Sequence, residues 1–246
     1  WLDKELQPLL KHFPWIIPNS MAAIRKLENT FTSKKCLLVS ADATTLYTNI
    51  NLDEGIRKIK ALLLSKQVDH DRACLIADLL SWVMRNNYFQ YQDKWYWQTC
   101  GTAMGTNVAP TFANLFVAFH EEKLMKNKDI KFPEIYFRYI DDVFFVWSGT
   151  EKELKTFQQK VNSLSPSLEF NFVNKRSHTS FLDLYIYKGR RFKECGTLDI
   201  RPYSKPCNPH LYTDPSTYQP NHIKYNWIQG ECVRLLRNSS NESNFL

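Results

Sequence analysis

Three aspartates carry the chemistry that this sequence suggests. Asp141 and Asp142 stand together inside Ile135–Trp147, between two runs of aromatic and β-branched residues. Such runs favour strands, and two acidic residues between two strands predict a tight hairpin turn at the edge of a hydrophobic sheet. Asp42 ends another short apolar run. Taken alone, each feature also fits a simpler interpretation, namely an Asp-rich surface turn for the pair and a strand-end cap for Asp42.

Three converging carboxylates would repel one another unless a cation compensated them. Ligands that are all oxygen suit a hard cation such as Mg²⁺, with Mn²⁺ as a possible substitute. Two such ions roughly 3.5–4 Å apart activate an attacking oxygen and stabilise a leaving one. The three aspartates therefore predict a site for in-line phosphoryl transfer.

The elements that must position these aspartates follow one another as strand, helix, two strands, helix, strand. The periodicity predicts them at residues 36–42, 109–125, 135–147, 151–164 and 168–173. This β-α-β-β-α-β order predicts an α+β fold, with an antiparallel sheet backed by two helices. In that topology the first strand lies beside the hairpin, so Asp42 meets Asp141 and Asp142.

The remaining segments are placed around this core. A large insertion at about 43–108 is predicted to hold helices that begin at Asn51 and Asp71, an aromatic hairpin at Tyr88–Trp97 and a small-residue loop before Pro110. Further strands are predicted at Phe181–Tyr187 and Arg191–Arg201, and a helix at Ile223–Arg237.

Composition bounds the class of protein. The 246 residues are 43% hydrophobic, enough for one sizeable core with a small appendage, and the net charge is +7. Residues 188–246 hold nine Lys/Arg against five Asp/Glu, a composition that favours a polyanionic partner but equally fits a solvated basic surface. The six cysteines lack zinc-ligand spacing, which favours a reducing intracellular compartment. No run resembles a signal peptide or a membrane span, and the start at Trp1 suggests a fragment.

Three motifs occur in an order that resembles the palm of reverse transcriptases. They are Asp42-x-x-x-x-Tyr47, Met104-Gly105-x-x-x-Ala109-Pro110 and Tyr139-Ile-Asp-Asp142. Four further segments resemble one group within this family, the Penelope-like element reverse transcriptases. These segments are Leu46–Ile50, Gly101–Thr106, Phe181–Leu184 and Tyr203–Pro206.

The resemblance implies a polymerase right-hand palm with partial fingers over 1–202, the insertion at about 43–108 belonging to the fingers and palm. It implies the start of a thumb or connection over 203–246. The implied activity is RNA-directed DNA polymerisation by a retroelement enzyme, a nucleotidyltransferase that uses two Mg²⁺ ions. Its partners would be an RNA template, a DNA primer and dNTPs, with no membrane. A nuclear location and a nuclease domain outside this chain would accompany that activity.

The resemblance also assigns roles to single residues. Asp42, Asp141 and Asp142 would be the catalytic metal ligands, with Asp142 the weaker or outer one. Residues at the nucleotide would be Tyr47, which excludes a 2′-hydroxyl, with Gly105, Gln98 and Asn107. Residues at the primer and template would be Tyr139, Phe181, Leu182, Lys205, Lys224, Arg234 and Arg237, while Asp183 would be structural.

Several alternatives stay open at this level. Lys175 (or Arg176) is a candidate proton donor to pyrophosphate, or simply part of a solvated basic turn. Tyr47 is also compatible with a core tyrosine, and the basic residues near the C-terminus with an exposed helix face. Asn107, Ser204 and Cys207 depart from the family pattern, and the family's triphosphate-binding fingers strands precede the segment that Leu2–Leu10 resembles. A polymerase-like nucleic-acid-binding module without catalysis, or a DNA-templated repair polymerase, are therefore competing hypotheses.

Overall fold

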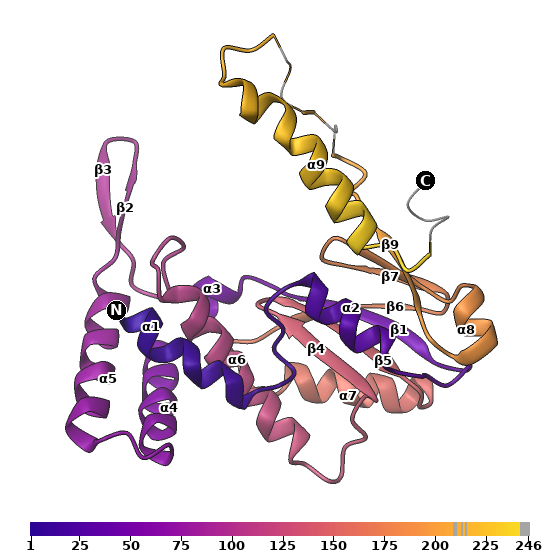
Figure 1. Cartoon of the computed structure of the whole chain (residues 1–246). Coiled ribbons are helices and arrows are strands. Elements are labelled where there is room, and N and C mark those ends of the chain that lie inside the picture. Colours follow the sequence, from indigo (N-terminus) through magenta and orange to yellow (C-terminus); the bar gives the residue numbers. More distant parts are fainter. Residues whose placement is uncertain (209–210, 213, 215, 242–246) are drawn as a thin grey trace.

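The central sheet has four antiparallel strands in the order β4-β5-β1-β6. These strands are β1 (Leu37–Ala43), β4 (Ile135–Tyr139), β5 (Asp142–Trp147) and β6 (Phe170–Lys175). Their β-branched and aromatic residues alternate between the two faces, and both faces are covered, so most strand residues are buried. Figure 1 shows this computed structural model, which describes residues 1–208, 211–212, 214 and 216–241.

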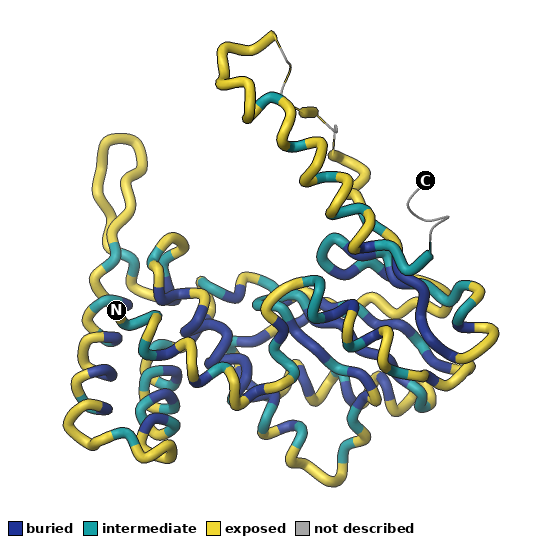
Figure 2. The backbone as a smooth tube through the Cα atoms, in the orientation of Figure 1, coloured by how far each residue is buried: buried dark blue, intermediate teal, exposed yellow. Residues whose placement is uncertain are grey.

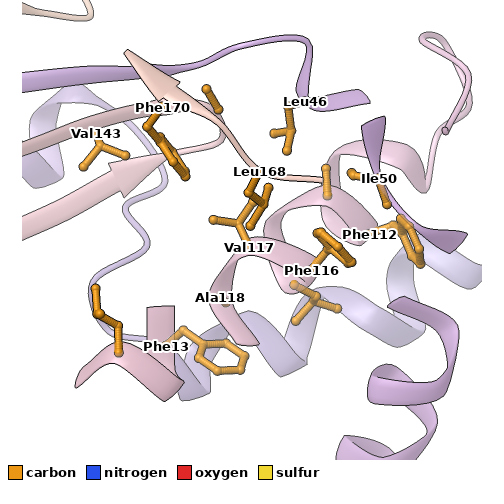
Figure 3. Packing of buried hydrophobic residues seen from close by; sticks show 14 of the residues in the cluster. Phe13, Leu46, Ile50, Phe112, Phe116, Val117, Ala118, Val143, Leu168 and Phe170 are labelled. Carbon is orange, nitrogen blue, oxygen red and sulfur yellow. The ribbon is translucent and has the colours of Figure 1, made fainter. Parts of the chain in front are cut away.

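Two helices, α6 (Ala109–Met125) and α7 (Glu151–Asn162), cover one face of this sheet. α6 is buried nearly all round, and Phe112 and Phe116 pack among the residues drawn in Figure 3. α7 begins with a capping box at Thr150, whose hydroxyl accepts from the Glu153 amide while the Glu153 carboxylate accepts from the Thr150 amide. The predicted β-α-β-β-α-β palm is thus the observed arrangement.

The other face is covered by α2 (Ser20–Glu28) and by a three-stranded sheet of β7 (His178–Phe181), β8 (Leu184–Tyr187) and β9 (Asp199–Pro202). Here two predicted strands are right only in part. Phe181–Tyr187 starts at the last residue of β7 and turns at Leu182, where φ is +54°, so only Leu184–Tyr187 forms one strand, β8. Most of Arg191–Arg201 is helix α8 (Arg190–Cys195), which ends at the left-handed Gly196 before β9 begins.

The insertion after β1 is mostly helical, as predicted. It contains α3 (Leu46–Asn49), α4 (Leu52–Ser65), α5 (His70–Arg85) and the hairpin of β2 (Tyr88–Tyr91) and β3 (Lys94–Trp97). The Asn51 side chain caps α4 by accepting from the Glu54 amide at 3.0 Å. α1 (Leu2–Leu6) and the 3₁₀ helix η1 (Gln7–His12) pack against α5 and α6.

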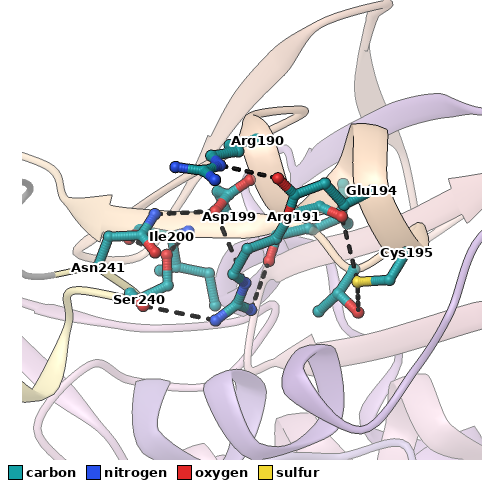
Figure 4. A network of polar contacts seen from close by, with 10 residues as sticks. Arg190, Arg191, Glu194, Cys195, Asp199, Ile200, Ser240 and Asn241 are labelled. Atoms are coloured by element: carbon teal, nitrogen blue, oxygen red, sulfur yellow. Dashed lines mark hydrogen bonds and ion pairs between the residues drawn. The ribbon is translucent and has the colours of Figure 1, made fainter.

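Two elements project from the body, the β2–β3 hairpin and helix α9 (Asn221–Arg237). Figure 2 shows both as largely exposed, and α9 has no buried residue. The chain after α9 returns to β9, where Asn241 donates to Asp199 at 3.0 Å and the Ser240 amide donates to the Ile200 carbonyl at 2.9 Å (Figure 4). Among the described residues, no helix is both long enough and apolar enough to cross a membrane.

Candidate active site

Asp42 and Asp142 lie directly opposite each other on β1 and β5. Both side chains lie on the sheet face that is covered by the β7–β9 sheet. Side chains alternate between the two faces along a strand, and the adjacent residues Ala41, Ala43 and Val143 lie on the helix-covered face. Asp42 is exposed and Asp142 half-buried, so they stand where the cover of that face ends. Asp42 lies within β1 rather than at its end, which corrects the predicted boundary.

The hairpin turn consists of Ile140 and Asp141, and Asp142 is already the first residue of β5. The predicted turn of two aspartates is therefore shifted by one residue. Ile140 adopts φ +54°, an uncommon conformation for a β-branched residue. The Ala43 amide donates to the Asp141 carbonyl at 3.1 Å, which ties the turn to the end of β1.

The electrostatics show that the three carboxylates act on one another. Burial, then the charges of Asp141 and Asp42, raise the pKa of Asp142 to about 6. Partial desolvation and Asp141 likewise raise the pKa of Asp42. Lys205 opposes both shifts, so its ammonium group lies near the pair. Lys205 thus belongs to the surroundings of the carboxylates, which its predicted place at the start of a thumb did not indicate.

Tyr47 lies on the Asp141 side of this group. Its pKa is raised by burial, by the charge of Asp141 and by Tyr139. Tyr139 ends β4 and pairs with Asp142 across the hairpin. The structure therefore brings together the first and third sequence motifs.

The loop of the second motif packs on the backbone of Tyr47. The Thr102 amide donates to the Tyr47 carbonyl at 2.7 Å, and Gly101, with φ +70°, lies close against the same carbonyl. Gly105 has φ +101° and open space where a Cβ would lie. A side chain is therefore excluded there by backbone conformation and not by packing within the chain.

Gln98 and Asn107 have neighbours other than the three carboxylates. The Gln98 side chain is used inside the chain, where its Nε2 donates to the Cys100 carbonyl at 2.9 Å. Asn107 and Gly105 line a groove of about 890 Å³ together with Trp1 and Trp82. The three carboxylates are absent from that groove's lining among the described residues. Trp82 is a further candidate contact that its place on a helix did not reveal.

A buried network fixes the hairpin from the helix-covered face. Arg138 is fully buried and pairs with Glu121 of α6, with Nε 2.8 Å from Oε1. Its Nη1 donates to the Ile140 carbonyl at 2.7 Å. Arg138 is not among the residues predicted from the sequence, although an arginine at an inward position of an aromatic strand indicates a buried partner.

Two other predicted roles need correction. Lys175 pairs with Leu38, four residues along β6 from Asn171, which lies opposite Asp42. At roughly 3.3 Å per residue this is about 13 Å, so Lys175 is at the wrong end of the sheet to act as general acid. Phe181 is 3% exposed and packs on Phe137 and Phe144, so its side chain is core.

The predicted template-binding residues divide into two groups. Arg234 is engaged inside the chain, with Nη2 2.6 Å from Glu231 and Nη1 3.8 Å from Asp183. Arg237 is exposed on α9 and Lys224 half-buried there, and Leu182 is half-buried at the β7–β8 turn. Arg237, Lys224 and Leu182 thus remain available for contact.

The donor set fits a hard divalent cation, because carboxylate oxygens are its preferred ligands. Part of the raised pKa of Asp142 comes from Asp141 and Asp42, and a bound cation would relieve that repulsion. Within the described part of the chain, however, no three His, Cys, Asp or Glu side chains are already grouped closely enough to hold a metal ion. Convergence of all three carboxylates would require the side chains to rearrange.

The fold is shared with nucleic-acid polymerases. Telomerase from Candida albicans in complex with a fragment of telomeric RNA superposes with a TM-score of 0.66 at 11% identity, over 94% of this chain and 40% of that chain. Apo telomerase from Candida tropicalis gives 0.61 at 13% identity, over 82% and 39%. The RNA-dependent RNA polymerase of a human picobirnavirus gives 0.61 at 11% identity, over 98% and 49%. The chain thus spans less than half the length of these polymerases.

No curated protein sequence matches the chain. The sequence profile described as "Reverse transcriptase (RNA-dependent DNA polymerase)" matches residues 1–205, most of its length and all three motifs. This chain belongs to the reverse transcriptase family.

Proposed function

We propose that this chain is the palm-centred part of an RNA-directed DNA polymerase, which adds deoxynucleotides to a DNA primer on an RNA template. The single observation that carries the proposal is the direct pairing of Asp42 with Asp142, with Asp141 in the adjoining turn. Three neighbouring carboxylates serve no packing purpose where two central strands of the sheet meet a turn, whereas a nucleotidyl-transfer site needs them.

Asp42, Asp141 and Asp142 would hold two divalent ions, Mg²⁺ or Mn²⁺. When bound, the ions would lower the pKa of the primer 3′-hydroxyl and neutralise charge on the departing pyrophosphate. Tyr47, near Asp141, would lie under the sugar and exclude a 2′-hydroxyl. Tyr139 would contact the primer end, and Gly105 would let the template and the new base pair approach the backbone.

Residues 1–202 would form the palm with partial fingers and residues 203–246 the start of a thumb. Within the latter, residues 209–210, 213, 215 and 242–246 lie outside the described part. Lys205, Lys224 and Arg237 would contact phosphates. The residue sequences of the Leu46–Ile50 and Gly101–Thr106 segments support a Penelope-like retroelement as the source. A nuclear location and a separate nuclease domain belong to the same proposal.

A primer-extension assay of the purified chain, with RNA or DNA templates and Mg²⁺ or Mn²⁺, tests the proposal. Asp141→Asn should lower the incorporation rate on the order of a thousandfold, because a metal-ligating carboxylate is lost. Asp129→Asn, which changes an exposed loop aspartate, is the matched control. Equal extension by both variants would contradict the proposal, and a preference for DNA templates would favour a repair polymerase.

A second candidate is a polymerase-like module that binds nucleic acid without catalysis. The observation that favours it is the lack of a preformed metal-holding group among the described residues. Template–primer binding that is unaffected by Mg²⁺, together with no incorporation by the wild-type chain, would support this candidate.

A further inference from the structure

Arg138 is the one arginine among the buried polar and charged side chains of the described chain, at 0% exposure. Its Nε and Nη2 donate to the two carboxylate oxygens of Glu121 at 2.8 and 3.0 Å, a bidentate pair. Glu121 also accepts from the Tyr136 hydroxyl at 2.6 Å and from Trp15 Nε1 at 2.7 Å. The carboxylate therefore has four donors and the pair cannot rotate freely.

The remaining nitrogen of the guanidinium group, Nη1, contacts the hairpin turn that contains Asp141. Nη1 donates to the Ile140 carbonyl at 2.7 Å and to Asn114 Oδ1 at 2.7 Å. Ile140 precedes Asp141 in the two-residue turn and has φ +54°. An isoleucine in this region is disfavoured by its Cβ, so the turn needs an external contact to hold it.

Packing supplies that contact only in part, since Ile140 is half-buried against the core. A hollow of about 550 Å³ lies beside the turn and is lined by residues that include Tyr139, Ile140 and Asn114. The guanidinium is thus a rigid link from the turn to helix α6. The strand backbone adds a second link, since the Arg138 amide donates to the Trp15 carbonyl at 2.9 Å.

Stability alone is a poor reason for such a pair. Desolvating two charges offsets most of their attraction, and well-packed neutral residues of similar volume often stabilise a core equally well. What the pair adds is a defined position for the Ile140 carbonyl, because the planar fork of arginine fixes direction as well as distance.

We propose that Arg138 is a positioning residue, which sets the place of the Asp141 carboxylate relative to Asp42 by holding the Ile140 carbonyl. The inference rests on the proposed function for its catalytic consequence, whereas the effect on the turn is independent of activity. Arg138 itself touches no reacting atom.

The test compares Arg138→Lys, the neutral double variant Arg138→Met/Glu121→Gln, and the control Lys126→Met. Lys126 forms an exposed ion pair with Glu122 on the same helix, so its loss should change nothing. Lysine keeps the charge of Arg138 but has no planar fork, so it cannot reproduce the bidentate pair with Glu121 together with the bond to the Ile140 carbonyl. The double variant leaves no unpaired buried charge and keeps an oxygen acceptor for Tyr136.

The first readout is amide hydrogen exchange in the folded variants. The Ala43 amide, bonded to the Asp141 carbonyl, should lose at least tenfold in protection, whereas the next amide, Thr44, bonded to Glu169, should not. Unchanged protection of Ala43 in both variants would overturn the proposal.

The second readout is primer extension by the same samples. We expect kcat to fall on the order of ten- to a hundredfold, with KM for dNTP and duplex affinity within about twofold, because a displaced group costs rate more than binding. A normal kcat in a variant whose Ala43 protection is lost would refute the catalytic part. A wild-type chain without incorporation, but with the expected exchange pattern, would refute the proposed function and leave the positioning role standing.

Discussion

Asp42 of β1 faces Asp142 of β5 as a directly opposed pair of the antiparallel ladder. Like charges directly opposite each other destabilise a sheet. Burial, then the charge of Asp141 and after it that of Asp42, raise the pKa of Asp142 to about 6 from an ordinary value of 3.8. The mutual repulsion of the three carboxylates is therefore greatest when all three are ionised.

The sign of the resulting pH dependence is defined. The native state keeps the Asp142 proton up to about pH 6, while the unfolded state loses it near pH 4, so native stability falls as pH rises between these values. Asp142→Asn should leave stability unchanged below pH 4 and raise it by about 1 kcal/mol above pH 6, after allowance for solvent screening. Urea unfolding with EDTA at pH 4 and pH 7.5 measures this. A gain of the same size at both pH values would contradict the prediction.

Lys205 lies near the carboxylates of Asp42 and Asp142, whereas Lys175 lies far from them along β6. The charge of Lys205 lowers the pKa values of Asp42 and Asp142, so Lys205→Met should raise them and move the acidic limb of the incorporation rate to higher pH. Lys175→Met should leave the rate and its pH profile unchanged, because Lys175 pairs with Leu38 at the far end of β1. If Lys175→Met lost the basic limb of the pH–rate profile, this prediction would be wrong and Lys175 would be the general acid.

Gly101 and Gly105 share a positive φ but differ in their surroundings. A Cβ on Gly101 would overlap the Tyr47 carbonyl, whereas one on Gly105 would meet nothing within 4 Å. Gly105→Ala should cost about 1–2 kcal/mol of unfolding free energy from backbone strain, and Gly101→Ala clearly more because the loop must also move off α3. Denaturant titration of both variants gives the comparison, and equal losses would show that the Gly101 contact is not tight.

Tyr47 should control the choice of sugar. Tyr47→Ala should lower the preference for dNTP over rNTP at least tenfold, since the ring that would block a 2′-hydroxyl is removed, whereas Tyr47→Phe should keep the preference. Single-nucleotide incorporation kinetics with each nucleotide measure the ratio. An unchanged ratio in Tyr47→Ala would mean that Tyr47 is only a packing residue.

Asp183 should hold the base of α9. It accepts from Asn238 Nδ2 at 2.6 Å, and its backbone carbonyl accepts from the Tyr203 amide at 2.8 Å. Asp183→Ala should cost about 1–2 kcal/mol, because the buried Asn238 amide is left unpaired. Limited proteolysis should then cut within α9 sooner. Asp183→Asn, which keeps the accepting oxygen, is the milder control.

The sequence by itself was sufficient for the order of the palm elements and the helix caps. Alternation in Ile135–Tyr139, the α6 periodicity and the Thr150 capping box are local patterns, and local patterns act within a few residues of themselves. Asp42, Asp141 and Asp142 were identified from such patterns, and the predicted strand order indicated that they lie close together, whereas the role of Tyr47 came only from the resemblance to reverse transcriptases.

Only the tertiary structure decided contacts that depend on register and on distant partners. The register of β6 on β1 shows that Lys175 lies far from the site. The turn at Leu182 shows that Phe181 ends β7, where its side chain lies in the core. Arg138 is buried because Glu121, seventeen residues earlier in sequence, lies on the helix packed against its strand. Register and burial are set by the summed packing of the whole sheet, which no short stretch of sequence contains.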